Sequence, residues 1–159
     1  MEHGGMTKLT KLIFCVALPL LAGSIGSYFT SPSIPTWYAS LVKPVFNPPS
    51  WVFGPVWTTL FIMMGVALYL VLQKNAKNKK EAYAFFGIQL FLNVLWSFLF
   101  FGLHSPLLAF IEIIFLLAAI LATMYFFNRI SKTASYLLIP YALWVSFATV
   151  LNFSLYLLN

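Results

Sequence analysis

The sequence predicts an all-α integral membrane protein, a bundle of five transmembrane helices in one domain. The chain is 62% hydrophobic and only 8% charged, with a mean hydropathy of +0.92, far from the average soluble domain. Its apolar residues fall in stretches of about 20 residues, the length that an α-helix needs to cross about 30 Å of hydrocarbon. The alternating pattern of membrane β-strands is absent from the sequence. The expected spans are approximately residues 12–30, 51–73, 82–102, 107–127 and 135–158.

The first expected span follows a short N-terminal tail, residues 1–11. Residues 1–5 precede a second methionine and have the character of a cloning remnant. Lysines followed by an apolar run and the small residues at 22–24 also fit a signal peptide. Apolar character continues without a polar break to Phe29, which favours a membrane span. The domain is therefore expected to cover residues 12–159.

The basic residues predict how the five helices are oriented. If the helices alternate in direction, Lys43 falls on one side of the membrane and all other basic residues fall on the N-terminal side. Because cytoplasmic loops carry an excess of positive charge, we expect a multi-pass cell-membrane protein with its N-terminus in the cytoplasm and its C-terminus outside. The net charge of +6 is then a topology signal and does not indicate binding to nucleic acid. The eight residues expected on the cytoplasmic side are Lys8, Lys11, Lys74, Lys77, Lys79, Lys80, Arg129 and Lys132.

Between the first two spans, residues 37–60 hold three of the five tryptophans and four of the nine prolines. Proline lacks a backbone donor and fixes φ, so the run up to Pro49 cannot be one continuous helix. The second helix is expected to begin near Trp51 or Val52. A stiff, aromatic connection of this kind fits a rim or lid over a flat, apolar ligand. It also fits the belt of Trp and Tyr that multispan proteins place at the membrane interface, and the composition leaves both open.

The third and fifth spans each carry polar and aromatic residues on one face. On the third span the face consists of Gln89, Asn93, Trp96, Ser97 and Phe100, and on the fifth of Trp144, Ala148, Leu151 and Asn152. Amides are costly when they face lipid, so both faces should point into the bundle. We expect Pro140 to kink the first turns of the fifth helix.

These faces converge with the second span at one depth. Trp51 should lie at the surface, with Trp57 about 9 Å beneath it. A lined cavity under the proline-rich loop is one interpretation. The other is that the amides hold neighbouring helices together.

In the fourth span, Glu112 is the only acidic residue inside an apolar stretch, which makes it a functional candidate. It lies about one and a half turns from the end of the span, near His104. This position favours a structural hydrogen bond or a water-filled notch.

Two pairs of small residues, one on the first span and one on the fourth, permit close helix approach and favour a homodimer, although they fit internal packing as well. The pairs are Ala22 with Gly26 and Ala118 with Ala122.

Several chemistries lack the residues that they require. Cys15 is the single cysteine, so an intrachain disulfide is impossible, and with His3 and His104 it cannot form a metal cluster. The sequence contains no glycine-rich phosphate loop, nucleophile elbow or zinc-protease motif, and no convincing internal repeat. These observations argue against hydrolytic and phosphoryl-transfer chemistry and against a required metal or cofactor.

Three long motifs resemble one known family. WYASLVKPVFNPPSWVFGPVWTTL at 37–60, QLFLNVLWSFLFFG at 89–102 and WVSFATVLNFSLYLLN at 144–159 occur in the order found in the translocator protein / tryptophan-rich sensory protein family, once called the peripheral-type benzodiazepine receptor family. The resemblance covers residues 12–159 and is greatest to bacterial members. It implies a pocket among five helices, closed by the first loop. The implied ligands are protoporphyrin IX, haem-like tetrapyrroles, sterols, and synthetic isoquinoline carboxamides or benzodiazepines.

The resemblance also implies roles for individual residues. Trp57 and Asn93 match polar positions that can hold a ligand carbonyl or carboxylate. Some bacterial members promote light-dependent breakdown of protoporphyrin IX, and Trp57 and Trp144 are the expected catalytic residues, because an indole can donate an electron to an excited porphyrin. The full expected ligand-binding set is Tyr38, Pro48, Pro49, Trp51, Trp57, Asn93, Trp96, Phe100, Trp144, Ala148 and Leu151.

One departure from the family concerns sterols. Animal members place a basic residue after a tyrosine near the C-terminus, whereas Tyr156 here is followed by Leu157, Leu158 and Asn159. Cholesterol binding is correspondingly less expected. Two functions stay open: photo-oxidative degradation of protoporphyrin IX, and non-catalytic binding, sensing or transport of the same ligands.

Overall fold

The computed structural model describes residues 7–77 and 79–159, and all regular elements among these residues are helical. The described part contains five helical segments that are long and apolar enough to cross a membrane: Lys8–Tyr38, Ser50–Gln73, Lys79–Gly102, Pro106–Asn128 and Lys132–Leu158. The predicted five-span all-α architecture is therefore confirmed. The suggested cloning remnant and His3 lie outside the described residues.

The first span is longer than expected. Helix α1 covers Lys8–Ser33 and continues into the π-helical turn η1, Ile34–Tyr38, whereas the sequence suggested an end near residue 30. Pro32 and Pro35 lie where the α-helical turns give way to the wider π turns, because each proline removes a backbone donor. Tyr38 is thereby carried on a helix and not on the loop.

The next three spans agree with the predicted ranges to within a few residues. A single 3₁₀ turn, η2 (Ser50–Val52), leads into α2 (Phe53–Gln73), which confirms a helix start near Trp51. Helix α3 covers Lys79–Ser97 and ends in the π-helical turn η3, Phe98–Gly102. Helix α4 covers Pro106–Asn128.

The fifth span consists of two helices. The short α5, Lys132–Tyr136, is followed after two residues by α6, Ile139–Leu158. We expected Pro140 to kink the first turns of the fifth helix, and the span is in fact interrupted at residues 137–138, directly before the turn that contains Pro140. Pro140 instead lies in the first turn of a new helix, where its missing N–H would have no intrahelical partner in any case.

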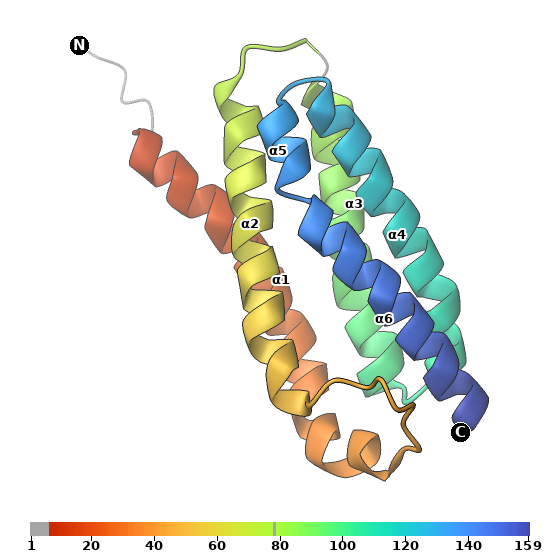
Figure 1. Cartoon of the computed structure of the whole chain (residues 1–159). Coiled ribbons are helices and arrows are strands. Elements are labelled where there is room, and N and C mark those ends of the chain that lie inside the picture. The colour runs from red at the N-terminus through yellow and green to blue at the C-terminus, as the bar shows by residue number, and fades with distance from the viewer. Residues whose placement is uncertain (1–6, 78) are drawn as a thin grey trace.

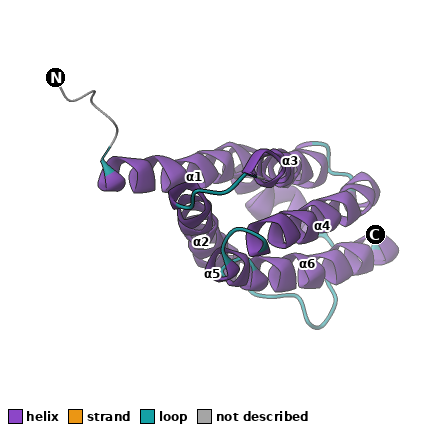
Figure 2. Cartoon of the chain, turned by 90° about the horizontal axis from the view of Figure 1, so that it is seen from above, coloured by secondary structure: helices purple, strands orange, loops and turns teal. Residues whose placement is uncertain are grey.

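The helices form a ring in which α2, α1, α3 and α4 follow one another, and α5 and α6 complete the circle (Figures 1 and 2). The start of α1, the end of α2, the start of α3 and the connection after α4 lie at one end, which we call the basic end. Residues 39–49 and the C-terminus lie at the other, the loop end (Figure 1). At the basic end, α5 packs between α2 and α4. At the loop end the ribbons of α2 and α6 diverge (Figure 1).

The small-residue pairs have different surroundings. Gly26 is buried, and a Cβ placed on it would lie 3.0 Å from the Ser97 hydroxyl oxygen of α3. Ala22 packs partly against the core. Both residues therefore serve internal packing, whereas Ala118 of the other pair is exposed on α4. The homodimer stays a prediction, with the α4 face as the part available to a second copy.

Candidate functional site

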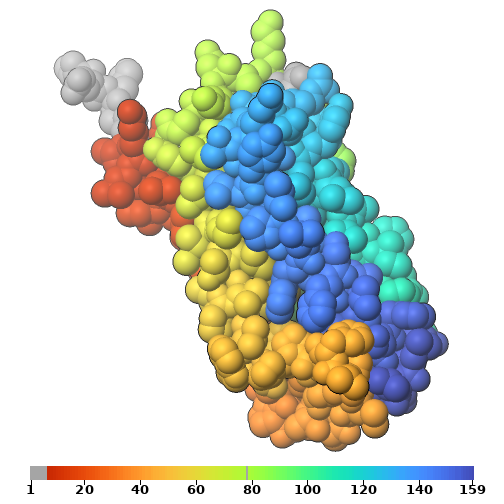
Figure 3. Space-filling view, viewed as in Figure 1, coloured from red at the N-terminus to blue at the C-terminus, as the bar shows by residue number. Residues whose placement is uncertain are grey.

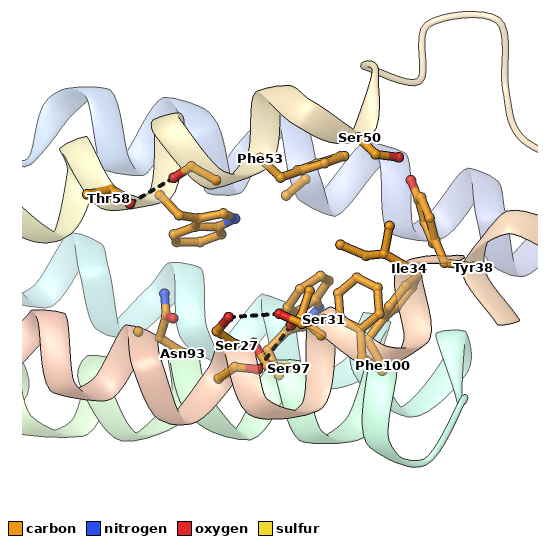
Figure 4. A pocket seen from close by; sticks show the side chains of 18 of the residues that line it. Ser27, Ser31, Ile34, Tyr38, Ser50, Phe53, Thr58, Asn93, Ser97 and Phe100 are labelled. Atoms are coloured by element: carbon orange, nitrogen blue, oxygen red, sulfur yellow. Dashed lines mark hydrogen bonds between the residues drawn. The ribbon is translucent and has the colours of Figure 1, made fainter. Parts of the chain in front are cut away.

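A cavity of about 830 Å³ lies at the loop end, in the size range of small-molecule pockets. Helices α1, α2, α3 and α6 supply its walls, and most of its surface is aromatic or aliphatic. Figure 4 shows Phe53 and Thr58 on one side of the cavity and Ser27, Ser31 and Asn93 on the opposite side. The predicted cavity beneath the proline-rich loop therefore exists.

Most of the residues expected from the sequence line this cavity. The wall includes Tyr38, Trp51, Trp57, Asn93, Trp96, Phe100, Trp144, Ala148 and Leu151. Pro48 and Pro49 are not among the lining residues. Pro49 instead precedes the first turn of η2, and the carbonyl of Pro48 accepts a hydrogen bond of 3.0 Å from the Asn47 amide. These two prolines shape the loop and do not form the wall of the cavity.

Asn93 belongs to both the cavity wall and a polar network in the core. Its amide donates to the Tyr141 hydroxyl at 2.8 Å, and that hydroxyl donates to the Gln89 carbonyl at 2.8 Å. Gln89 in turn faces the sulfur of Met64. The interpretation of the amides as contacts between helices is thus correct for Gln89, while Asn93 holds α3 to α6 and also reaches the cavity.

Trp96 uses its polar atom in a helix contact. Its indole N–H donates to the Asn152 carbonyl at 3.0 Å, and the Asn152 amide donates to the Pro106 carbonyl at 2.8 Å. The indole stacks on Phe100 with ring centroids 5.1 Å apart. Trp96 therefore offers an aromatic surface to the cavity, and its N–H is already occupied.

Trp57 and Trp144 differ from Trp96 in this respect. Within the described residues, neither indole N–H donates to a protein group, although both residues line the cavity. Phe61 stacks on Trp57 at 5.6 Å, and Phe53 contacts Trp144 edge-on at 6.1 Å. The two indoles are held in place by aromatic neighbours, and their donors are available to an acceptor on a ligand.

The loop over the cavity, residues 39–49, is pinned at several points. The Tyr38 hydroxyl donates to the Asn47 side chain at 2.7 Å. The backbone of Val42 exchanges two hydrogen bonds with the Asn159 amide, at 2.9 and 3.0 Å. Phe46 contacts Phe147 of α6 at 6.3 Å, and the loop covers the loop end of the molecule in Figure 3. The loop is therefore held in place at the loop end, although none of residues 39–49 lines the cavity, and its role as a lid stays a prediction.

The contribution of α1 to the site was missed at the sequence level. Gly23, Ser27, Thr30 and Ile34 recur at intervals of three or four residues and line the cavity along one face of the helix. The sequence does contain a signal for this face, because small and hydroxyl residues recur there at helical spacing. From this stretch, however, we used only Gly26, and only as a residue for helix packing. Tyr141 was also missed, because nothing in its sequence surroundings distinguishes a hydrogen-bonded tyrosine from an interfacial one.

Glu112 does not make the expected hydrogen bond. It is buried, and neither carboxyl oxygen has a hydrogen-bond partner within the described residues. His104 instead stacks on Trp37 at 4.5 Å and lies 3.3 Å from the Ser33 hydroxyl. The described residues contain no group of three His, Cys, Asp or Glu side chains that could hold a metal ion.

A model of the TspO/MBR family matches residues 15–157. This chain belongs to the TspO/MBR family. The expected family is thereby confirmed, and with the five apolar helices it establishes a multi-pass membrane protein.

Relatives in the TspO/MBR family match the chain over most of its length. The tryptophan-rich protein TspO of Chlorobaculum tepidum is 48% identical over 154 residues, 96% of this chain and 98% of the relative. The protein of the same name from Archaeoglobus fulgidus is 45% identical over 152 residues, 96% of this chain and 99% of the relative. The translocator protein of Homo sapiens is 37% identical over 138 residues, 85% of this chain and 82% of the relative.

Proposed function

We propose that this protein binds flat, largely apolar molecules that carry a polar acceptor group, with tetrapyrroles such as protoporphyrin IX as the principal class. The cavity of about 830 Å³ supports this proposal, because it combines aromatic walls with two indole donors that have no partner among the described residues. Isoquinoline carboxamides and benzodiazepine-type compounds share the same chemistry, an aromatic body with a carbonyl acceptor, and are proposed as synthetic ligands of the same cavity.

We further propose that the bound porphyrin is degraded oxidatively in light. The excited porphyrin takes an electron from an indole and passes it to dissolved oxygen, which becomes superoxide. The indole radical cation regains its electron from the macrocycle, and the resulting porphyrin radical cation combines with superoxide, so that oxygen is added to the porphyrin and the tryptophan is regenerated. Trp57 and Trp144 are the proposed electron donors, because both line the cavity and are held by aromatic neighbours. Fixed donors beside a bound substrate have the proximity advantage of any preorganised site. A pinned loop above the substrate would limit access of water.

Illumination of the purified protein with protoporphyrin IX tests both proposals. Replacing Trp57 and Trp144 by Phe keeps most of the apolar contact, so we expect most of the affinity to remain while light-driven loss of porphyrin absorbance is suppressed. Trp37→Phe is the matched control, because Trp37 lies against His104 and is not a lining residue of the cavity. This control should bleach the porphyrin at the wild-type rate.

The alternative function is non-catalytic binding, sensing or transport of the same ligands. Transport is included among these alternatives because the human relative carries the name translocator protein. If the double Phe variant bleaches bound porphyrin as fast as the wild type, free singlet oxygen is responsible. The catalytic proposal would then be withdrawn and the binding proposal retained.

A further inference from the structure

The cavity is bordered on one side by residues that are exposed although they lie within the membrane-spanning helices. Ser27 and Ser31 of α1 and Gly54 and Thr58 of α2 all line the cavity, and all four are exposed. Figure 4 shows Ser27 and Ser31 across the cavity from Thr58. Lining residues that remain exposed mark the place where the cavity opens to the surroundings of the bundle.

Helices α1 and α2 run antiparallel (Figure 1), and the glycines along them have different surroundings. Near the basic end, a Cβ on Gly65 would clash with the Cα of Val16, so the two backbones touch there. Closer to the middle, a Cβ on Gly23 would lie 2.5 Å from the ring of Phe61. Farther toward the loop end, a Cβ on Gly54 would meet no atom within 4 Å. The space beside Gly54, an exposed lining residue of the cavity, is therefore open, whereas Gly65 and Gly23 are in close contact with the neighbouring helix or ring.

The other sides of the cavity are closed. Phe53 contacts Trp144 at 6.1 Å, and Trp57 contacts Tyr141 at 6.2 Å, so aromatic pairs join α2 to α6. On the α3 side, Gly26 fits directly against Ser97. The loop end is covered by residues 39–49, which are fixed through Asn47 and Asn159 as described above.

We propose that ligands enter and leave the cavity sideways, from the hydrocarbon of the membrane, through a window between α1 and α2 whose rim is Ser27, Ser31, Gly54 and Thr58. This inference rests on the proposed function, because it specifies how the ligand reaches that same cavity. A flat lipophilic molecule partitions into the bilayer, so its local supply is in the lipid and not in the water above the loop.

The chemistry of the rim fits a ligand that carries a polar group. The Ser27 and Ser31 hydroxyls pair with each other at 3.1 Å, and the Thr58 hydroxyl donates to the Gly54 carbonyl at 2.9 Å. The Thr58 donor is satisfied in the absence of a ligand, and in the serine pair one hydroxyl donates to the other, which leaves one O–H for an acceptor on a ligand. Each oxygen retains lone pairs, and the Ser27–Ser31 pair can redirect a proton toward a passing carbonyl or carboxylate.

Substitution of Gly54 tests the window. Gly54→Phe projects a ring into open space at the rim, and we expect association and dissociation of protoporphyrin IX both to slow by about tenfold, equivalent to about 1.4 kcal/mol in the barrier. Stopped-flow quenching of tryptophan fluorescence in lipid nanodiscs measures both rates. Gly87→Phe is the matched control, because Gly87 lies on α3 outside the cavity and its Cβ would also meet nothing within 4 Å. This control should exchange ligand at wild-type rates.

Slower dissociation is the decisive observation. A side chain that only occupied ligand space would weaken binding and accelerate release, and that result would contradict the window. A second variant keeps the test independent of folding in Gly54→Phe. It carries Ser27→Cys and Thr58→Cys in a Cys15→Ala background, and a bis-methanethiosulfonate cross-linker joins the two thiols through disulfides that a reductant can cleave. We expect the cross-link to slow exchange and reduction to restore it, whereas equal rates in both states would contradict the window.

Entry through the loop predicts a different pattern. Asn159→Ala removes both hydrogen bonds to Val42 and loosens the cover. Exchange that is accelerated by Asn159→Ala and unaffected by Gly54→Phe would overturn the inference in favour of access from water. A wild-type protein without saturable quenching by protoporphyrin IX would instead contradict the proposed function, which is a distinguishable result.

Discussion

At the scale of single residues, Asn93 has two roles that one substitution cannot separate. It lines the cavity, and its amide also donates to Tyr141. A loss of affinity in Asn93→Ala alone could therefore follow from a disturbed core as well as from a lost ligand contact. Tyr141 offers a way to separate the roles, because its hydroxyl lies in the network but Tyr141 is not a lining residue.

We expect Tyr141→Phe to lower stability and to retain binding. The substitution leaves the amides of Asn93 and Gln89 without their shared partner, at a cost of about 1–3 kcal/mol. It keeps Asn93 on the wall, where its released N–H group can still meet a ligand. Thermal unfolding and protoporphyrin IX titration of the same nanodisc samples measure the two effects.

Two comparisons complete this experiment. Tyr136→Phe on the exposed side of α5 is the control and should match the wild type in both measurements. Asn93→Ala should weaken binding in addition to stability. If Asn93→Ala lowers the melting temperature but leaves affinity unchanged, Asn93 serves only to hold helices together, and its ligand role is wrong.

At the scale of helices, the contact between α1 and α2 depends on one glycine. Gly65 is buried, and a Cβ on it would lie 2.7 Å from the carbonyl oxygen of Cys15 as well as against Val16. Both neighbours are backbone atoms of a helix, which cannot rotate away as a side chain can. The absence of a side chain at Gly65 therefore determines how closely the two helices approach.

We predict that Gly65→Ala destabilises the bundle by about 1–3 kcal/mol, the usual cost of overpacking, or more where the backbone cannot yield. Gly87→Ala is the matched control on α3, where the new methyl group meets no neighbour. Because Ala is the better helix former, this control should be neutral or slightly stabilising. Equal melting temperatures for the two variants would show that α1 is not seated closely against α2.

At the scale of the whole molecule, the basic residues gather at one end. The start of α1, the end of α2, the start of α3 and the connection after α4 lie together at the basic end, opposite the loop that contains Lys43 (Figure 1). The structure thus confirms the grouping predicted from alternating helices. By the positive-inside rule the basic end should face the cytoplasm, which is a prediction about the membrane and not about the fold.

Cysteine labelling in cells tests this orientation. In a Cys15→Ala background, Val45→Cys places a thiol on the fully exposed loop, and Lys132→Cys places one at the basic end. We expect a membrane-impermeant maleimide to label Val45→Cys in intact cells and Lys132→Cys only after the membrane is permeabilised. The reverse pattern would place the N-terminus outside.

Much of the fold could be read from the sequence, because a membrane span is a local property. A helix in lipid must satisfy its own backbone hydrogen bonds, so about 20 apolar residues suffice to identify it. The differences from the predicted ranges lie near prolines. The first span continues through Pro32 and Pro35, whereas the fifth span is interrupted just before Pro140. Whether a helix tolerates the missing N–H of a proline depends on its neighbours in the fold.

The sequence by itself therefore determined the five spans, the grouping of charge and the tryptophan-rich stretches that line the cavity. Only the tertiary structure decided which donors are free, since the indole of Trp96 is bound to Asn152 while those of Trp57 and Trp144 have no partner among the described residues. It also decided where the cavity opens. The approach of α1 to α2 is set by contacts between residues far apart in the chain, such as Gly65 against the backbone of Cys15 and Val16.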